Sequence, residues 1–265
     1  MTTYTTNHAH SVLHTHGWRT AQNSAPHLLP HINPTSKILD IGCGPGSITV
    51  DLACLASSSH VTGIEYFPDP LDGARALAAA RGVTNVDFQV GDIHALEFED
   101  DTFDIVHVHQ VLQHIKDPVQ ALKEMRRVVK PGGIVSARES DSFSWYPPNK
   151  GIASWVTLTT DIAAAKGGNP HPGKRMHVWA KQAGFNIGHI ERSTGSWCFS
   201  TPKEREYWGE GMAKRMEDSG FAEQSLEGEF ASKEEMGDIA RGWREWVKDE
   251  EGWFGVLHGQ MLCWK

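Results

Sequence analysis

The 265-residue sequence has few of the features that mark secreted, membrane-spanning or nucleic-acid-binding proteins. Its four cysteines have no paired spacing, so we expect reduced thiols and no disulfide framework. It shows no charged-then-apolar leader and no run of about eighteen apolar residues, which argues against secretion and a membrane span. Basic residues are fewer than acidic ones, 25 against 33, and the formal net charge of −8 opposes a nucleic-acid substrate because phosphate contacts dominate such affinity. We therefore expect a cytoplasmic protein.

Histidine is abundant, with fifteen residues in all, and two HxH pairs lie near the amino terminus. These pairs are formed by His8 with His10 and by His14 with His16. No carboxylate or thiol accompanies them, although these groups are common metal ligands beside imidazole. The sequence therefore predicts no metal site.

The most informative stretch is ILDIGCGPGSITVDLA, residues 38–53. A buried strand ends here, and three glycines follow at every second position before an apolar helix. Glycine lets the backbone come close to a ligand, and the following helix offers free N–H groups and the positive end of its dipole. Ser47 replaces the last glycine of a dinucleotide fingerprint, and no GK[ST] of a P-loop is present. A cofactor loop is indicated, with a turn that binds nothing as the alternative; its candidate binding residues are Asp40, Gly42, Cys43, Gly44 and Gly46.

The next two strands both end close to acidic residues. Residues 60–64 form a short apolar strand that leads to Glu65, where a carboxylate can accept both hydroxyls of a ribose. A third strand at 86–90 leads to Asp92 and Ile93, which suit the amine and the face of an adenine. Tyr66 or Phe67 would then cover the other face of that base. Either acid alone is compatible with an ordinary strand end, whereas both together favour a nucleoside.

In these motifs the chain resembles the class I S-adenosylmethionine-dependent methyltransferases, and among them the small-molecule enzymes similar to those of ubiquinone and menaquinone biosynthesis. The resemblance is close over residues 37–139 and weak elsewhere. It implies that the methionyl end of S-adenosylmethionine lies on the glycine loop, that Glu65 binds the ribose, and that Asp92 with Ile93 binds adenine. The motifs that carry it are DIGCGPG at 40–46, GIEY at 63–66, VGDIHALEFEDDTFDIVHVHQVLQHIKDP at 90–118 and LKEMRRVVKPGGIV at 122–135.

Alternating strands and helices predict an α/β fold, a doubly wound, Rossmann-like sheet of seven strands with its ligand crevice at the carboxyl ends. We expect a mostly parallel sheet whose last strand is antiparallel at the sheet edge, as in the family. No element is predicted over 141–172, which is rich in glycine, proline and aromatic residues. The expected strands are 37–41, 60–65, 86–90, 103–108, 134–138, 185–191 and 254–264, and the expected helices include 17–29, 69–81, 173–183 and one that begins after Asp117.

We expect a single methyltransferase domain over 1–265, made of an N-terminal cap (1–36), a cofactor-binding core (37–139) and an inserted helical lid (196–251). Inserted segments at the carboxyl edge of such sheets usually determine substrate specificity. Nine of the ten tryptophans lie at or after position 145. Wide aromatic faces suit a bulky, partly apolar or aromatic acceptor, or a cation held by the ring faces, although they also suit packing of the lid against the sheet.

Methyl transfer needs an aligned nucleophile and, for a hydroxyl, thiol or acidic carbon, removal of a proton. By the family's geometry His109 lies near the sulfonium, where it contacts the cofactor and acts as a base or lines the site. Glu139 and Tyr146 are the other candidate catalytic residues, because they follow the fifth strand. Arg19 is the only arginine or lysine before Lys37, and we expect it at the methionyl carboxylate, with an arginine on the protein surface as the alternative.

The expected activity is transfer of a methyl group from S-adenosylmethionine to a small hydrophobic or aromatic metabolite, with O- or C-methylation favoured. The alternative is a protein of the same fold that uses the cofactor structurally or for a rearrangement without methyl transfer. A dinucleotide oxidoreductase is disfavoured by the spacing of the glycines.

Overall fold

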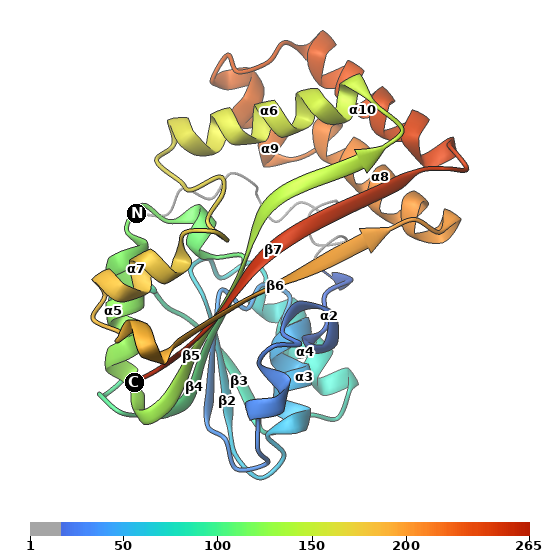
Figure 1. Cartoon of the computed structure of the whole chain (residues 1–265). Coiled ribbons are helices and arrows are strands. Elements are labelled where there is room, and N and C mark those ends of the chain that lie inside the picture. Colours follow the sequence, from blue (N-terminus) through green and yellow to red (C-terminus); the bar gives the residue numbers. More distant parts are fainter. Residues whose placement is uncertain (1–16) are drawn as a thin grey trace.

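The computed structural model describes residues 17–265 and contains one seven-stranded sheet, in the order β3-β2-β1-β4-β5-β7-β6 (Figure 1). The first five strands pair in parallel, whereas β7 runs antiparallel to both β5 and β6. The predicted fold class is therefore confirmed. The expectation that the last strand lies at the edge is wrong, because β7 lies between β5 and β6. The strands are β1 (Ile38–Ile41), β2 (Val61–Glu65), β3 (Val86–Val90), β4 (Phe103–His109), β5 (Val129–Tyr146), β6 (Ile190–Phe199) and β7 (Trp253–Trp264).

Helices cover both faces of the sheet, and this explains why its central strands are buried over most of their length. All four residues of β1 are buried. The helices α2 (Ala21–Ser24), α3 (Ser47–Leu55) and α4 (Leu71–Ala80) lie together on one face, and α5 (Pro118–Val128) and α7 (Met176–Gln182) lie on the other (Figure 1). As predicted, α5 begins after Asp117, whose side chain accepts from the backbone N–H of Gln120.

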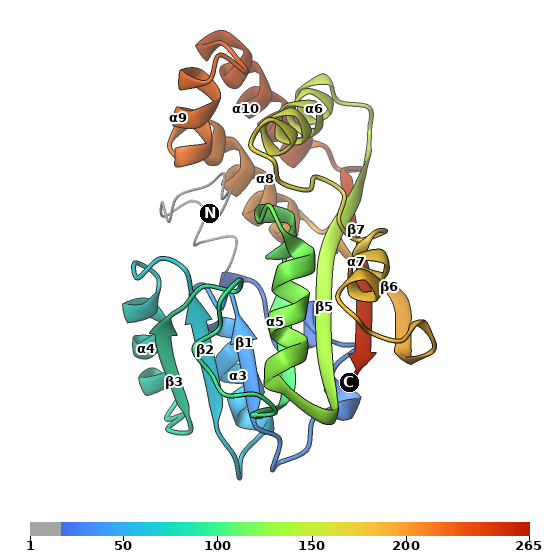
Figure 2. The same cartoon turned by 90° about the vertical axis from the view of Figure 1, so that its left-hand side faces the viewer.

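A helical lid stands above the carboxyl ends of the central strands, at the top of Figures 1 and 2. It consists of α6 (Lys150–Ala165), α8 (Pro202–Glu217), α9 (Gly220–Glu227) and α10 (Lys233–Lys248). The upper parts of β5 and β7 extend into it, and an apolar cluster that includes Trp155, Trp243, Trp246 and Phe254 joins these elements. Trp243 and Trp246 are almost fully buried there. Packing of the lid against the sheet is therefore one use of the tryptophans, and others line the cavity described below.

Two expected elements begin or end elsewhere. The helix expected at 17–29 is limited to α2 and a short 3₁₀ turn at Leu29–His31, because Pro26 has no N–H to continue the helix. Strand six does not run over 185–191 but over Ile190–Phe199, where its backbone pairs with β7. The helices after it consequently begin at Pro202 and not at 196.

The segment 141–172, for which no element is predicted, contains the last part of β5 and the helix α6. β5 continues to Tyr146, and α6 then begins after Asn149, whose side chain accepts from the backbone N–H of Ile152. Gly151 and Gly242 allow α6 and α10 to approach closely, since a Cβ on Gly151 would lie 2.8 Å from the Cα of Gly242. No helix in the described part of the chain is long and apolar enough to cross a membrane.

Candidate active site

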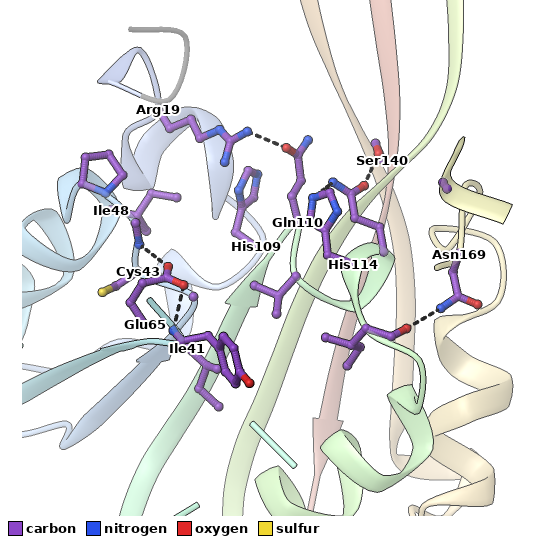
Figure 3. Close-up of a pocket in the computed structure, with 18 of the residues that line it drawn as sticks. Arg19, Ile41, Cys43, Ile48, Glu65, His109, Gln110, His114, Ser140 and Asn169 are labelled. Carbon is purple, nitrogen blue, oxygen red and sulfur yellow. Dashed lines mark hydrogen bonds between the residues drawn. The ribbon is translucent and has the colours of Figure 1, made fainter. Parts of the chain in front are cut away.

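A cavity of about 270 Å³ lies between the carboxyl ends of the parallel strands and the lid (Figure 3). One half of it is lined by the glycine loop, by the ends of β2 and β4, and by the turn after β3. The other half is lined by side chains of α6, α8, α9 and the upper strands. We call these the loop half and the lid half. The crevice thus lies where a doubly wound sheet usually binds its ligand.

The glycine loop lines the cavity with Gly42, Cys43 and Gly44. Gly44 has a φ of +51°, and a Cβ built on it meets no atom within 4 Å, so its backbone faces open space. Gly42 and Gly46 are required by packing: a Cβ on Gly42 would lie 2.4 Å from Val111 Cγ2, and one on Gly46 would lie 2.7 Å from the Cβ of Ala74. Gly46 is not among the cavity-lining residues, and its contribution is to the turn into α3.

Glu65 lies at the end of β2 and faces the glycine loop (Figure 3). Its Oε2 accepts from the backbone N–H of Gly44 at 3.0 Å, and its Oε1 accepts from the backbone N–H of Tyr66 at 2.8 Å. Each carboxylate oxygen retains a lone pair for a ligand hydroxyl. Asp40, a neighbour at the end of β1, accepts from Thr49 Oγ1 at 2.6 Å, and burial raises the pKa of Asp40 to about 7.

The turn after β3 brings Ile93 but not the carboxylate of Asp92 to the cavity wall. Ile93 lines the cavity and is buried. Asp92 Oδ1 instead accepts from the backbone N–H of His94 at 2.9 Å and lies 2.8 Å from the Nδ1 of the same residue. Tyr66 and Phe67 also line this half, with their rings in an edge-to-face contact. Three of the four residues expected around an adenine are therefore placed at the cavity.

His109 ends β4, lines the cavity and is buried. Neither of its ring nitrogens has a hydrogen-bond partner among residues 17–265. Burial, followed by the positive charges of Arg19 and Arg138, holds the pKa of His109 well below its usual value. The imidazole is thus neutral at physiological pH, with one ring nitrogen that carries a hydrogen and one that carries a lone pair.

Arg19 joins the site from the segment before α2, as Figure 3 shows. Its Nη2 donates to Gln110 Oε1 at 2.6 Å, and its guanidinium lies 5.7 Å from the ring centroid of Trp197. Gln110 has a φ of +55°, and its Nε2 lies 3.1 Å from His258 Nε2. Strained non-glycine residues are concentrated at functional sites. Gln110 follows directly on the end of β4, where the functional end of this strand is expected, whereas no local signal in the sequence points to His258.

Two of the predicted catalytic residues do not face the cavity. Glu139 is fully buried, and its carboxylate accepts from the backbone N–H groups of Val111, Leu112 and Gln113, at 2.8, 2.8 and 3.3 Å. Burial raises the pKa of Glu139 to about 7. It fixes the loop that follows His109. Tyr146 lies at the far end of β5, half exposed, because the strand continues well beyond the sheet edge.

The lid half of the cavity is mostly aromatic and apolar, with a few polar groups. His114 lines it and accepts from Gln113 Nε2, which lies 2.9 Å from His114 Nε2. Thr159 and Thr160 donate their hydroxyl hydrogens to helix carbonyls, so their oxygens keep lone pairs. The apolar lining residues are Phe143, Trp155, Ala163, Pro170, Trp197, Trp208, Met212, Phe221 and Val256, and Arg215 is the cation among the lid residues that line it.

The loop half fits the cofactor implied by the sequence. The backbone at Gly44 leaves room for the ligand, and the carboxylate of Glu65 can accept hydrogen bonds from ribose hydroxyls. The apolar side chain of Ile93 offers a surface to the adenine ring. Among the described residues, no group of three histidine, cysteine, aspartate or glutamate side chains could hold a metal ion. The HxH pairs of the N-terminal cap lie outside the described residues.

Comparison with known proteins gives a family match over much of the chain. The model of a methyltransferase domain matches residues 32–194. An uncharacterized methyltransferase of Schizosaccharomyces pombe is 32% identical over 259 residues, which cover 95% of this chain and 92% of that protein. A demethylmenaquinone methyltransferase of Staphylococcus aureus is 39% identical over 105 residues, which cover 39% of this chain and 43% of that protein.

Among solved structures, the chain is similar to a phosphoethanolamine N-methyltransferase of Haemonchus contortus in complex with S-adenosylhomocysteine. The TM-score is 0.53 and the identity 21%, with 90% of this chain and 52% of that chain covered. At this identity the likeness establishes the fold alone. The resemblance recognised in the sequence is confirmed by the family model and by the relative in Schizosaccharomyces pombe.

Proposed function

We propose that this chain, which belongs to the methyltransferase domain family and is an S-adenosylmethionine-dependent methyltransferase, acts on a small hydrophobic or aromatic metabolite. The methyl group is transferred to an oxygen or a carbon of that metabolite. The observation that carries this proposal is the composition of the lid half, where aromatic and apolar side chains predominate and adjoin His109. Offset and edge-to-face contacts with Trp155 and Trp208 suit a flat ring.

Bound in the loop half, S-adenosylmethionine supplies an electrophilic methyl group on a sulfonium. We assign Gly42, Cys43 and Gly44 to its methionyl part, Glu65 to the ribose hydroxyls, and Ile93 with Tyr66 to the adenine. Arg19 is our candidate for the methionyl carboxylate, because it lines the same cavity and is a permanent cation. Asp40 stabilises the turn from β1 to α3, because it accepts a hydrogen bond from the hydroxyl of Thr49.

His109 is the candidate catalytic residue in this proposal. The neutral imidazole has one nitrogen with a lone pair, which no described residue engages, and this nitrogen can accept a proton from a hydroxyl or from an acidic carbon as the methyl group is transferred. Glu139 acts on it indirectly, since its carboxylate fixes the backbone of 111–113 directly after the β4 end. Trp197 and the lid exclude water from the reacting atoms, which strengthens every polar contact there.

The same proposal covers the organisation of the chain and its setting. We assign one methyltransferase domain, with the cofactor site on the core and the acceptor site beneath the lid helices. A cytoplasmic location and the absence of a nucleic-acid substrate belong to the proposal, and the net charge of −8 supports the latter.

The proposal is tested by incubating the protein with methyl-labelled S-adenosylmethionine and separate pools of phenols, 1,3-dicarbonyl compounds, amines and thiols. We expect S-adenosylhomocysteine to form and label to enter a phenol or a carbon acid. Transfer to amines or thiols only would overturn the O- or C-specificity. Cofactor binding with no transfer to any pool would favour the alternative, in which S-adenosylmethionine is used structurally or for a rearrangement.

A further inference from the structure

We propose that the methyl acceptor carries an anionic group on its ring, and that Arg215 binds this group in the lid half of the cavity. The inference rests on the proposed function and specifies its substrate as an aromatic acid. It concerns a residue outside the cofactor motifs, on a helix that the minimal fold does not need.

Arg215 is placed at the cavity by the geometry of α8. Trp208, Met212 and Arg215 follow one another at spacings of four and three residues, so they share one face of the helix. All three line the cavity. The side chain of Arg215 is half-buried, whereas its neighbours Lys214 and Glu217 point to solvent. A guanidinium is thus presented to the same space as the aromatic walls.

The charges of the lining residues differ between the two halves. The acidic lining residues are Asp40 and Glu65, and both belong to the loop half. No described residue that lines the lid half is an aspartate or a glutamate. The outer surface of the same helices is acidic, because residues 203–251 contain fifteen acids and eight bases. The sign of charge therefore reverses from the outside of the lid to the inside, which favours an anionic ligand over a neutral or cationic one.

The electrostatic influence of Arg215 extends across the cavity to the loop that follows β4. Burial, then the charges of Arg19 and Arg215, lower the pKa of His114 to about 4. His114 is therefore neutral at physiological pH and does not compete with Arg215 for an anion. Arg19 donates to Gln110 in the loop half. In this assignment Arg19 belongs to the cofactor and Arg215 to the acceptor.

The surroundings of Arg215 favour a carboxylate attached to a ring. Trp155, Trp208 and Phe221 provide flat apolar walls, and a planar guanidinium pairs with a carboxylate through two parallel hydrogen bonds. Apolar walls weaken screening by water, so the charge of such a ligand contributes more here than at an open surface. A ring that packs on the walls with its carboxylate on Arg215 leaves its other substituents facing His109.

The test compares 2-naphthoate with 2-naphthamide, which have nearly the same shape and differ in charge. Their affinities are measured by calorimetry on the full chain saturated with S-adenosylhomocysteine. We expect the wild type to bind naphthoate at least about tenfold more tightly than naphthamide. In Arg215→Met the ratio should fall to about one, through loss of naphthoate affinity alone.

The matched control is Arg241→Met, which removes the same charge from α10. Arg241 is 66% exposed in its side chain and pairs with Asp238 on the lid surface. It should keep the wild-type ratio, and thermal unfolding checks that both variants are folded. An unchanged ratio in Arg215→Met, no preference for naphthoate in the wild type, or no binding of either probe would each overturn the inference. Methyl transfer to uncharged phenols in the same preparation would show that the proposed function stands without it.

Discussion

The carboxylate of Glu65 accepts a hydrogen bond from the backbone N–H of Gly44, with 3.0 Å between Oε2 and N. The bond joins the end of β2 to the glycine loop after β1, two segments that the sequence assigns to different parts of one cofactor. Glu65 therefore has two functions in the proposed site, since it presents oxygens to the ribose and holds the loop that faces the methionyl part. Loss of this carboxylate should affect both ends of the ligand.

Glu65→Ala should weaken binding of S-adenosylmethionine by about 2–4 kcal/mol, because two charge-assisted hydrogen bonds to the ribose are lost. Calorimetric titration measures the change. The control is Glu227→Ala, which removes an exposed carboxylate from α9 and should bind as the wild type does. A dissociation constant that is the same in Glu65→Ala and in the control would contradict the ribose assignment.

Gly44→Val should abolish cofactor binding, because the branched side chain would occupy the open space that the loop presents to the cavity. Gly82→Val is the matched control. Gly82 also has a positive φ, +66°, with no atom within 4 Å of a built Cβ, and it is not among the residues that line the cavity. Both variants should lose about 1–2 kcal/mol of stability from backbone strain. Only Gly44→Val should lose the cofactor, and equal binding by both variants would refute the assignment.

His109→Gln should lower the rate of methyl transfer by about 10²–10⁴-fold while cofactor affinity is kept, because glutamine fills similar space but cannot take up a proton. The wild-type rate should show no inflection near pH 6.5, since burial and the neighbouring cations hold the pKa of His109 well below that value. Steady-state rates from pH 5.5 to 8.5 provide both readouts. His189→Gln, at an exposed site, is the control. A wild-type rate in His109→Gln would exclude His109 as the base.

His107 should make the protein less stable in mild acid. It is fully buried in β4, and burial, then the charges of His27 and Arg138, lower the pKa of His107 to about 3. The unfolded chain, with a histidine pKa near 6.5, binds more protons below that pH than the folded chain does. The free energy of unfolding should therefore fall as the pH drops, by about 2 kcal/mol from this residue at pH 5.

Urea unfolding at pH 7.5 and pH 5.0 tests this for the wild type and for His107→Asn. In the wild type His107 Nδ1 lies 3.1 Å from Ser136 Oγ, and the asparagine side chain can form a hydrogen bond with the same hydroxyl. The variant should lose about 2 kcal/mol less between the two pH values than the wild type does. The exposed His189→Asn serves as a second comparison and should follow the wild type. An equal loss in all three proteins would show that His107 does not titrate in this way.

The parts of the site that were predictable from sequence are those encoded in short segments. The glycine loop, Glu65 and Ile93 each lie at the end of a strand or within three residues of it, and parallel pairing brings the strand ends together. His109 and Arg19 also reach the cavity as expected. These predictions needed only the order of strands and the position of a residue at a strand end.

The remainder depends on contacts between distant segments. Glu139 was expected to face the acceptor, yet three backbone N–H groups of a loop nearly thirty residues earlier bind its carboxylate. Tyr146 was misplaced because nothing local shows that β5 continues so far, paired with β7. His258 meets Gln110 across 148 residues of sequence. The lid half likewise arises from helix packing, in which Trp155 comes from α6, an element that was not predicted.

The most direct test of the account is a crystal structure of the protein with S-adenosylhomocysteine and an aromatic acceptor. We expect the ribose hydroxyls within hydrogen-bond distance of the Glu65 carboxylate, the homocysteine part along Gly44, and the acceptor ring between His109 and the lid tryptophans. A cofactor bound away from the glycine loop, or an acceptor bound outside the lid half of the cavity, would contradict it.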